Sequence, residues 1–219
     1  MIKRLLLGVL LLLLFIPIYA FKIEPNLVVV HRLQLGASSK PEELKVLQLS
    51  DIQVSESYAT KRLDKVIRKV NNEKPDIIVF TGDLFDNYSQ YNHEQEIIEK
   101  LKEMKATIGK YAVWGNHDYG GGAARIYQQV MNAADFDVLK NAGETISLAN
   151  GKRVFIGGLD DSLLGSPSID ETLSYRQGYD YSVLLTHEPD VADGFVGTNT
   201  QLVLAGHSHG GKFVCLFIR

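Results

Sequence analysis

The chain has 219 residues, of which 45% are hydrophobic and 22% are charged, a composition typical of an ordered globular protein rather than a disordered one. Its formal net charge is −3, so no basic excess points to a nucleic-acid partner. Cys215 is the single cysteine, which excludes an intramolecular disulfide and a metal site built from cysteine thiolates.

Residues 1–22 are predicted to be a membrane-targeting segment. Lys3 and Arg4 precede the uncharged residues 5–21, and a helix of that length would be about 25 Å long, slightly short of a bilayer core of about 30 Å. The segment is either a cleaved signal peptide or an uncleaved single-pass anchor with its basic end in the cytoplasm. The bulky Ile18 near the only candidate cleavage site favours the anchor, and a buried core helix is disfavoured because the run has no polar face. Either membrane alternative places the rest of the chain on the extracytoplasmic side of the cell membrane.

Residues 23–43 are predicted to contain a leading strand, over 26–35, and a linker, and residues 44–219 to form the main domain. From residue 44, short apolar runs alternate with helical patterns. Strands are expected at 45–50, 76–81 and 111–114. Helices are expected around 63–70, where apolar residues recur at i, i+3, i+4 and i+7, around 97–104, and from about 120 to 131.

The second half of the chain is richer in strands. Residues 145–148 and 153–157 flank Asn150-Gly151, which predicts a hairpin with a two-residue turn. Two further apolar runs, 181–186 and 201–205, also predict strands. Strands that alternate with helices indicate an α/β core.

Five of the predicted strands end in residues that can bind a metal or transfer a proton: Asp51, Asp83, Asn116 with His117, His187, and His207 with His209. Neighbouring strands bring their carboxyl ends to one edge of a sheet, so these residues are expected to converge. Each residue alone has an ordinary interpretation as a turn residue, a strand cap or a solvated histidine. Their combination, in this order and always at a strand end, favours a metal site.

The ligand types suggest which metals bind. Carboxylate, imidazole and amide oxygen, without thiolate, suit Mn, Fe, Zn or Mg. Asp83 can bridge two such ions about 3.5–4 Å apart, the spacing used for displacement at phosphorus. Two divalent ions, two aspartates and a bridging hydroxide leave a net positive charge, which favours a phosphate anion, and the ions lower the pKa of bound water enough to supply that hydroxide.

These motifs resemble the five-block signature of calcineurin-like metallophosphoesterases. The matching segments are Asp51-x-Gln53, Gly82-Asp83-x-x-Asp86, Gly115-Asn116-His117-Asp118, the isolated His187, and Gly206-His207-Ser208-His209. The hydrophobic leader and the Gly-His-Ser-His-Gly-Gly ending resemble the membrane-associated bacterial branch. The resemblance covers about residues 44–211 and implies an α/β fold, a four-layer α-β-β-α sandwich with the dimetal site at the sheet edges.

The resemblance also implies a role for each matching residue. Asp83 should bridge the two cations, with Asp51 and His209 completing the first site and Asn116, His187 and His207 the second. His117 should face the leaving group as general acid or phosphate stabiliser, and Asp86 should orient its imidazole. Asp118 is interpreted as a turn residue.

Two features depart from the family pattern. Gln53 stands where the family usually has histidine, and its amide oxygen is a weaker donor than imidazole. Either Gln53 still ligates, or the first metal is loosely held and prefers Mn or Mg; the alternative is a polar loop residue without metal contact. Only ten residues follow His209, and 212–219 predict the start of a strand. We therefore expect a domain that lacks its last C-terminal strands, with an uncovered sheet edge that promotes association.

The predicted function is a metal-dependent phosphoesterase that hydrolyses a phosphomonoester, phosphodiester or pyrophosphate bond. The membrane segment suggests a lipid-linked or envelope substrate. Two alternatives remain at this point: a truncated, inactive metal-binding remnant, and a non-catalytic membrane-tethered binding module. The sequence carries no prediction of oligomeric state.

Overall fold

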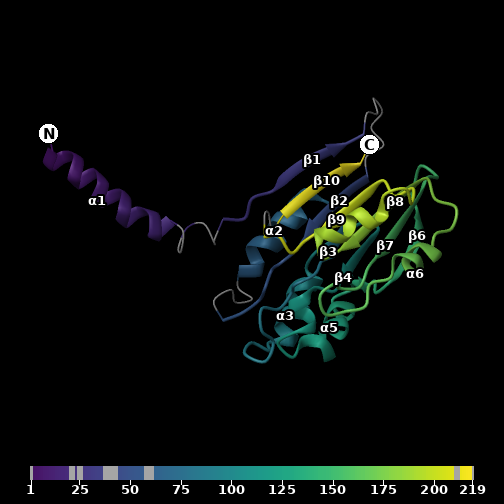
Figure 1. Cartoon of the computed structure of the whole chain (residues 1–219). Coiled ribbons are helices and arrows are strands. Elements are labelled where there is room, and N and C mark those ends of the chain that lie inside the picture. Colours follow the sequence, from purple (N-terminus) through teal and green to yellow (C-terminus); the bar gives the residue numbers. More distant parts are fainter. Residues whose placement is uncertain are drawn as a thin grey trace.

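The structure is a computed structural model of the chain and describes residues 2–19, 23, 27–36, 44–56, 62–209 and 213–218. Two sheets lie at the centre of the described domain (Figure 1). The six-stranded sheet has the order β1 (His31–Leu35), β10 (Phe213–Ile218), β2 (Leu44–Leu49), β3 (Ile77–Thr81), β4 (Gly109–Val113), β5 (Asp137–Val138). The four-stranded sheet has the order β6 (Ala142–Ser147), β7 (Arg153–Gly158), β8 (Tyr181–Thr186), β9 (Leu202–Ala205).

The strands that precede the predicted ligands are parallel to one another within each sheet. β2, β3 and β4 are parallel to one another, and so are β7, β8 and β9. The carboxyl ends of each set therefore lie along one edge of its sheet, where ligands bind in open α/β folds.

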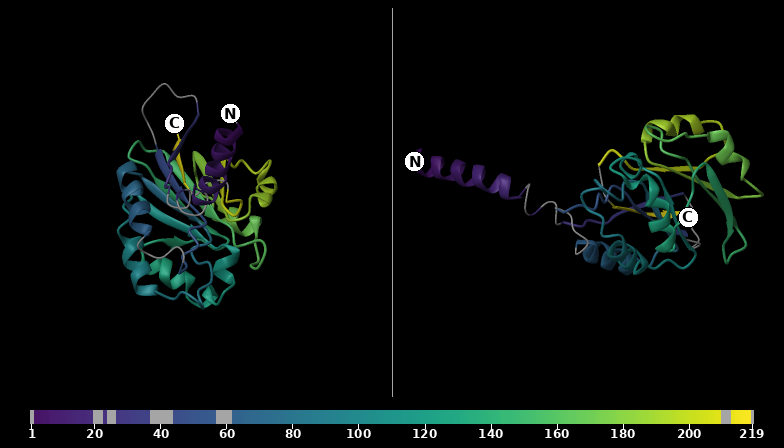
Figure 2. Two further views of the ribbon diagram at one scale, coloured as in Figure 1. Left: turned by 90° about the vertical axis from the view of Figure 1, so that its left-hand side faces the viewer. Right: turned by 90° about the horizontal axis from the view of Figure 1, so that it is seen from below.

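Helices cover the two outer faces of the paired sheets (Figures 1 and 2). The helices α2 (Leu63–Glu73), α3 (Glu94–Lys102) and α5 (Tyr127–Ala133) pack on the six-stranded sheet. The short helix α6 (Ile169–Ser174) and the 3-10 helix η5 (Pro189–Phe195) pack on the four-stranded sheet. In α2 the buried apolar residues are Leu63, Val66, Ile67 and Val70, the periodicity that predicted the helix.

Three apolar cores separate the four layers. In β3, Ile78 and Phe80 face the α2–α3–α5 layer, whereas Ile77 and Val79 face the other sheet. In β8, Leu184 faces α6 and η5 while its neighbours in sequence face the six-stranded sheet. Because successive side chains of a strand point to opposite faces, strands buried on both faces need continuous apolar runs. The predicted four-layer α-β-β-α sandwich is confirmed.

Most predicted elements are present, with differences at glycines. The helix expected over 120–131 does not begin at 120, because Gly121 and Gly122 take positive φ of 57° and 87°. The segment forms η4 (Ala123–Arg125) and α5 instead, and a separate short helix α4 (Asn116–Tyr119) precedes it. The hairpin over 142–158 forms, but Leu148 N–H donates to Lys152 O at 2.8 Å, so its loop has three residues with Gly151 left-handed rather than two. Residues 31–35 of the expected leading strand form β1, and residue 26 lies outside the described residues.

The N-terminal segment forms α1 (Ile2–Ile18), which extends away from the sandwich (Figure 1). It has 17 residues and includes Pro17 near its end. Across the described residues, no helix combines the length and apolarity needed to cross a bilayer, so the expected transmembrane helix is not found there. The strand predicted near the C-terminus is present as β10, paired with β1 and β2.

Candidate metal centre

The predicted ligands from both sheets meet at the carboxyl edge of the parallel strands. Backbone hydrogen bonds join segments far apart in sequence: Asp51 N–H donates to Gly82 O at 3.0 Å, and Gly206 N–H donates to His187 O at 2.9 Å. His207 N–H donates to Asp51 Oδ2 at 3.0 Å, across 156 residues of chain. The loops after the strands are thus joined to one another by hydrogen bonds in which each donor is a main-chain N–H, and these bonds bring their side chains together.

Asp83 lies at the middle of this cluster. Its Oδ1 accepts the His117 backbone N–H at 2.9 Å, and its Oδ2 lies 3.4 Å from both His187 Nε2 and Gln53 Nε2. Asp51, Asp83 and His187 are buried and offer three ligand atoms within 4.8 Å of one another. Burial raises the pKa of Asp83, but the hydrogen bond and charge of His187 outweigh it, so the pKa lies below its usual value and the carboxyl is ionised.

His187 is held in one orientation by a main-chain acceptor. Its Nδ1–H donates to Thr81 O at 2.7 Å, which directs Nε2 to Asn116 Oδ1 at 3.2 Å and His207 Nδ1 at 3.3 Å. This is the arrangement in which a histidine presents one ring nitrogen to a cation while the backbone sets its tautomer. Burial lowers the pKa of His187, but Asp83 and the Thr81 carbonyl raise it, and the net pKa is about 9.

That pKa predicts that metal binding releases a proton. Below pH 9 the metal-free His187 is protonated, and its Nε2 must lose that proton to ligate, so apparent affinity should rise about tenfold per pH unit between pH 6 and 8 and level off above 9. Calorimetry of Mn²⁺ binding in buffers of different ionisation enthalpy should detect release of at least about one proton at pH 7. Release of less than half a proton would show that His187 is neutral before the metal arrives.

Asp51 and His209 form the other side of the cluster. Asp51 Oδ2 accepts the His207 N–H, whereas Oδ1 is buried, has no hydrogen-bond partner among the described residues, and lies 3.7 Å from His209 Nε2. A buried carboxylate oxygen without a donor is costly unless a cation satisfies it. The residues present therefore fit divalent cations, with carboxylate, amide and imidazole ligands on both sides of Asp83.

Strained backbone is concentrated at these residues. Among the described non-glycine residues with positive φ are Asp51, Gln53, Asp83, His207 and His209, with φ from 49° to 63°. Such conformations cost on the order of 1 kcal/mol or more each and persist where a functional geometry requires them. Gly115 permits the close approach, because a Cβ there would come within 2.3 Å of Asp83 Oδ1.

Gln53 lies inside the cluster rather than in a remote loop. Its amide nitrogen is 3.4 Å from Asp83 Oδ2, and its backbone N–H donates to Asp83 O at 3.0 Å. A Gln53→His substitution should place an imidazole at the same position and strengthen the adjacent cation site by about tenfold or more, since imidazole is the stronger donor. Competition with a chromophoric chelator measures this, and unchanged affinity would mean that residue 53 does not ligate.

His117 is oriented by a main-chain atom. Its Nδ1–H donates to the backbone oxygen of Asp86 at 2.8 Å, and the Asp86 carboxylate lies farther away, at 3.8 Å. The orienting group therefore differs from the side chain that the sequence suggested. Nε2 of this half-exposed ring has no hydrogen-bond partner in the part of the chain that the structure describes, so it is available to a ligand.

Asp118, interpreted from sequence as a turn residue, is fully buried and organises the metal-binding loop. Its Oδ2 accepts Asp83 N–H at 2.8 Å and Gly115 N–H at 3.1 Å, and its Oδ1 accepts Leu84 N–H at 2.9 Å and Phe85 N–H at 3.4 Å. Burial and the charge of Asp83 raise its pKa to about 8, against the effect of these donors. This role could have been inferred from the sequence, because Asp118 stands three residues after the helix cap Gly115, where an acidic side chain accepts backbone N–H groups of the helix start.

Glu188 is a second residue that the sequence reasoning did not single out. It is buried, its Oε2 accepts Ser162 N–H at 2.9 Å, and it offers a carboxylate oxygen within 4.8 Å of ligand atoms of His187 and His207. Glu188 could have been predicted as a site residue, because it directly follows His187 at the end of a predicted strand.

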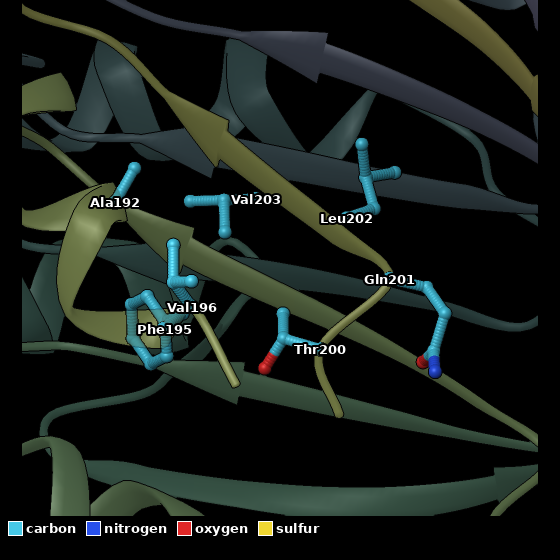
Figure 3. Close-up of a pocket in the computed structure, with 7 residues that line it drawn as sticks. All are labelled: Ala192, Phe195, Val196, Thr200, Gln201, Leu202 and Val203. Atoms are coloured by element: carbon cyan, nitrogen blue, oxygen red, sulfur yellow. The ribbon is translucent and has the colours of Figure 1, made fainter. Parts of the chain in front are cut away.

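A separate small hollow of about 180 Å³ lies on the outer side of β9, beside η5 (Figure 3). None of its lining residues carries a charge or an imidazole, so it lacks the carboxylates and histidines of the strand-end cluster: Ala192, Phe195, Val196, Thr200, Gln201, Leu202 and Val203. The chemistry-bearing groups are concentrated at the strand ends instead.

A four-layer sandwich with carboxylate, amide and imidazole groups converging at its sheet edges is the arrangement that the resemblance to metallophosphoesterases implies. The chain belongs to the calcineurin-like phosphoesterase family, whose profile matches residues 44–211. It is 39% identical over 197 residues to the Uncharacterized metallophosphoesterase YkuE of Bacillus subtilis, covering 89% of this chain and 69% of that protein. An Aquifex aeolicus metallophosphoesterase is 31% identical (88% and 71% covered), and Campylobacter jejuni Cj0846 is 30% identical (78% and 45% covered).

Proposed function

We propose that this metallophosphoesterase hydrolyses a phosphomonoester, phosphodiester or pyrophosphate bond with two divalent cations of the Mn, Fe, Zn or Mg type. The observation that supports two cations is the Asp83 carboxylate, whose Oδ2 lies 3.4 Å from both Gln53 Nε2 and His187 Nε2, residues from two different groups of candidate ligands. When bound, such cations withdraw charge from phosphoryl oxygens and lower the pKa of water.

The chain's own residues then have distinct tasks. Asp51, Asp83 and His209 hold the first cation, and Asn116, His187 and His207 hold the second together with Asp83. Glu188 adds negative charge beside the second group. His117 presents Nε2 toward the phosphoester, where it donates a proton or a hydrogen bond to the leaving oxygen.

The function is tested by hydrolysis of bis(p-nitrophenyl) phosphate and p-nitrophenyl phosphate by Mn²⁺-loaded protein, with metal content measured on the same sample. Turnover supports an active enzyme. Bound metal without turnover on either ester or on a pyrophosphate would support the inactive remnant instead. A binding module would keep its biological effect when Asp83→Asn and His117→Ala are introduced.

His117 and Asp86 should differ sharply in this assay. Loss of the imidazole in His117→Ala should lower kcat by about 10²–10⁴-fold. Asp86→Ala should cost less than about tenfold, because the main-chain oxygen that orients His117 survives the substitution. Equal losses in the two variants would show that the Asp86 carboxylate, rather than its carbonyl, positions the ring.

We further propose that α1 attaches the domain to a membrane on the extracytoplasmic side, which brings a lipid-linked or envelope phosphoester within reach. Supporting this, its described leucine, valine, isoleucine and phenylalanine side chains are more than two-fifths exposed, with Leu6 and Leu13 at 62%, so the sandwich does not bury them. Exposed apolar area of this extent calls for a lipid or protein surface. Flotation of the full chain with neutral vesicles tests the attachment.

A further inference from the structure

A pocket on α2 combines three cations with two apolar side chains. It has a volume of about 400 Å³ and is lined by Leu27, Val28, Lys65, Arg68, Lys69 and Asn72. Lys65, Arg68 and Lys69 are spaced i, i+3 and i+4 and therefore share one face of the helix, opposite the face that packs on the sheet. All three are exposed.

The positive charge of this pocket is not balanced by α2 itself. Asp64 is paired with Lys100 at 2.7 Å, and Glu73 is paired with Arg32. Among the described residues no carboxylate lies within ion-pair distance of Lys65, Arg68 or Lys69. Like charges at i and i+4 repel one another, so the three cations form a site that an anion would stabilise.

The pocket lies close to the point where the apolar helix joins the domain. Leu27 and Val28 line it, and Leu27 follows the end of α1 at Ile18 by nine residues, which span at most about 30 Å. In Figure 1, α2 lies on the side of the sandwich from which α1 extends. A bilayer that holds α1 would therefore present its headgroups near these cations.

We propose that this α2 pocket binds the phosphate of an anionic phospholipid headgroup at the membrane surface. Lys65, Arg68 and Lys69 contact the phosphate, while Leu27 and Val28 lie against the apolar part of the lipid. A lipid fits better than a soluble anion because Leu27, which lines the pocket, is 54% exposed, and a lipid would remove this apolar side chain from water. The contact is independent of the metal centre, and it fixes how the domain is oriented over the bilayer.

The test compares binding of the full chain to phosphatidylcholine vesicles and to vesicles with 30% phosphatidylglycerol, at 0.15 M salt. Each basic residue near an anionic surface strengthens binding about fivefold, so the three pocket residues should raise the ratio of the two affinities by a factor on the order of 100. α1, which carries Lys3 and Arg4, contacts both vesicles in every variant, so the change in the ratio between variants isolates the contribution of the pocket. In Lys65→Gln/Arg68→Gln/Lys69→Gln the ratio should fall by about this factor.

The matched control is Lys102→Gln/Arg125→Gln/Lys152→Gln, which removes the same charges from exposed positions on other elements and should keep most of the ratio. Since every substituted side chain is exposed, both variants should fold and retain phosphoesterase turnover. Equal binding of the wild type to both vesicles, or equal loss in the control, would overturn the proposal. Binding of free glycerol 1-phosphate that is lost in the α2 variant would assign the pocket to a soluble anion instead.

Discussion

Replacement of Asp118 by alanine is expected to lower the free energy of unfolding by at least about 3 kcal/mol, measured by urea denaturation in EDTA. Four backbone N–H groups from two loops share this one carboxyl group, and each buried donor left without an acceptor costs about 1–3 kcal/mol. Because the same donors position Asp83, metal binding should be lost as well.

Two comparisons make this result specific. Asp118→Asn keeps one acceptor oxygen but turns an amide N–H toward the other donors, so its cost should be intermediate. Asp193→Ala removes an exposed carboxylate and should change stability by less than about 0.5 kcal/mol. A loss below 1 kcal/mol for Asp118→Ala would mean that water replaces the carboxyl group and that the loop does not depend on it.

Asp83→Asn should abolish tight metal binding and lower kcat by at least about 10³-fold, since cation chemistry supplies several kcal/mol of transition-state stabilisation. The Asp83 carboxylate contacts His117, His187 and Gln53, and a neutral amide in its place cannot offset the charge of two cations. Metal content after gel filtration and turnover with added Mn²⁺ measure both effects.

The contrast with Asp118 separates a ligand from a structural support. In EDTA, Asp83→Asn should be much less destabilising than Asp118→Ala. The Asp83→Asn variant loses the ion pair with His187. It also removes the negative charge that repels Asp118 and raises the pKa of that residue, which offsets part of the loss of stability. Two metal ions retained per chain, with normal turnover, in Asp83→Asn would contradict the proposed centre.

Features that depend on residues close together in the sequence could be predicted from it, whereas features that depend on distant residues could not. Apolar runs ending in Asp51, Asp83, Asn116, His187 and His207 are local, and so is the helical periodicity of α2. Backbone geometry then forces a parallel sheet to bring such ends together, so the fold class and the candidate ligands could be predicted from the sequence.

The positive φ angles at Gly121 and Gly122 were not predicted, because these glycines lie against residues 87–89 of another loop. The three-residue hairpin loop was not predicted either, because its length depends on which backbone pair closes it, here Leu148 with Lys152. Likewise, the group that orients His117 is a carbonyl 31 residues away, and any residue type carries a carbonyl. The chemistry of a main-chain acceptor leaves no mark on composition or spacing.

Periodicity and side-chain chemistry along the chain are enough to predict the layered α/β class, the residue types of the metal centre and the apolar N-terminal helix. Three other features emerge only when the chain is folded: Asp118 is a buried acceptor, Glu188 lies beside His187 and His207, and Lys65, Arg68 and Lys69 line a pocket with Leu27. Those features arise from packing between segments that are distant in sequence, and their burial and charge are set by neighbours that no local pattern reveals.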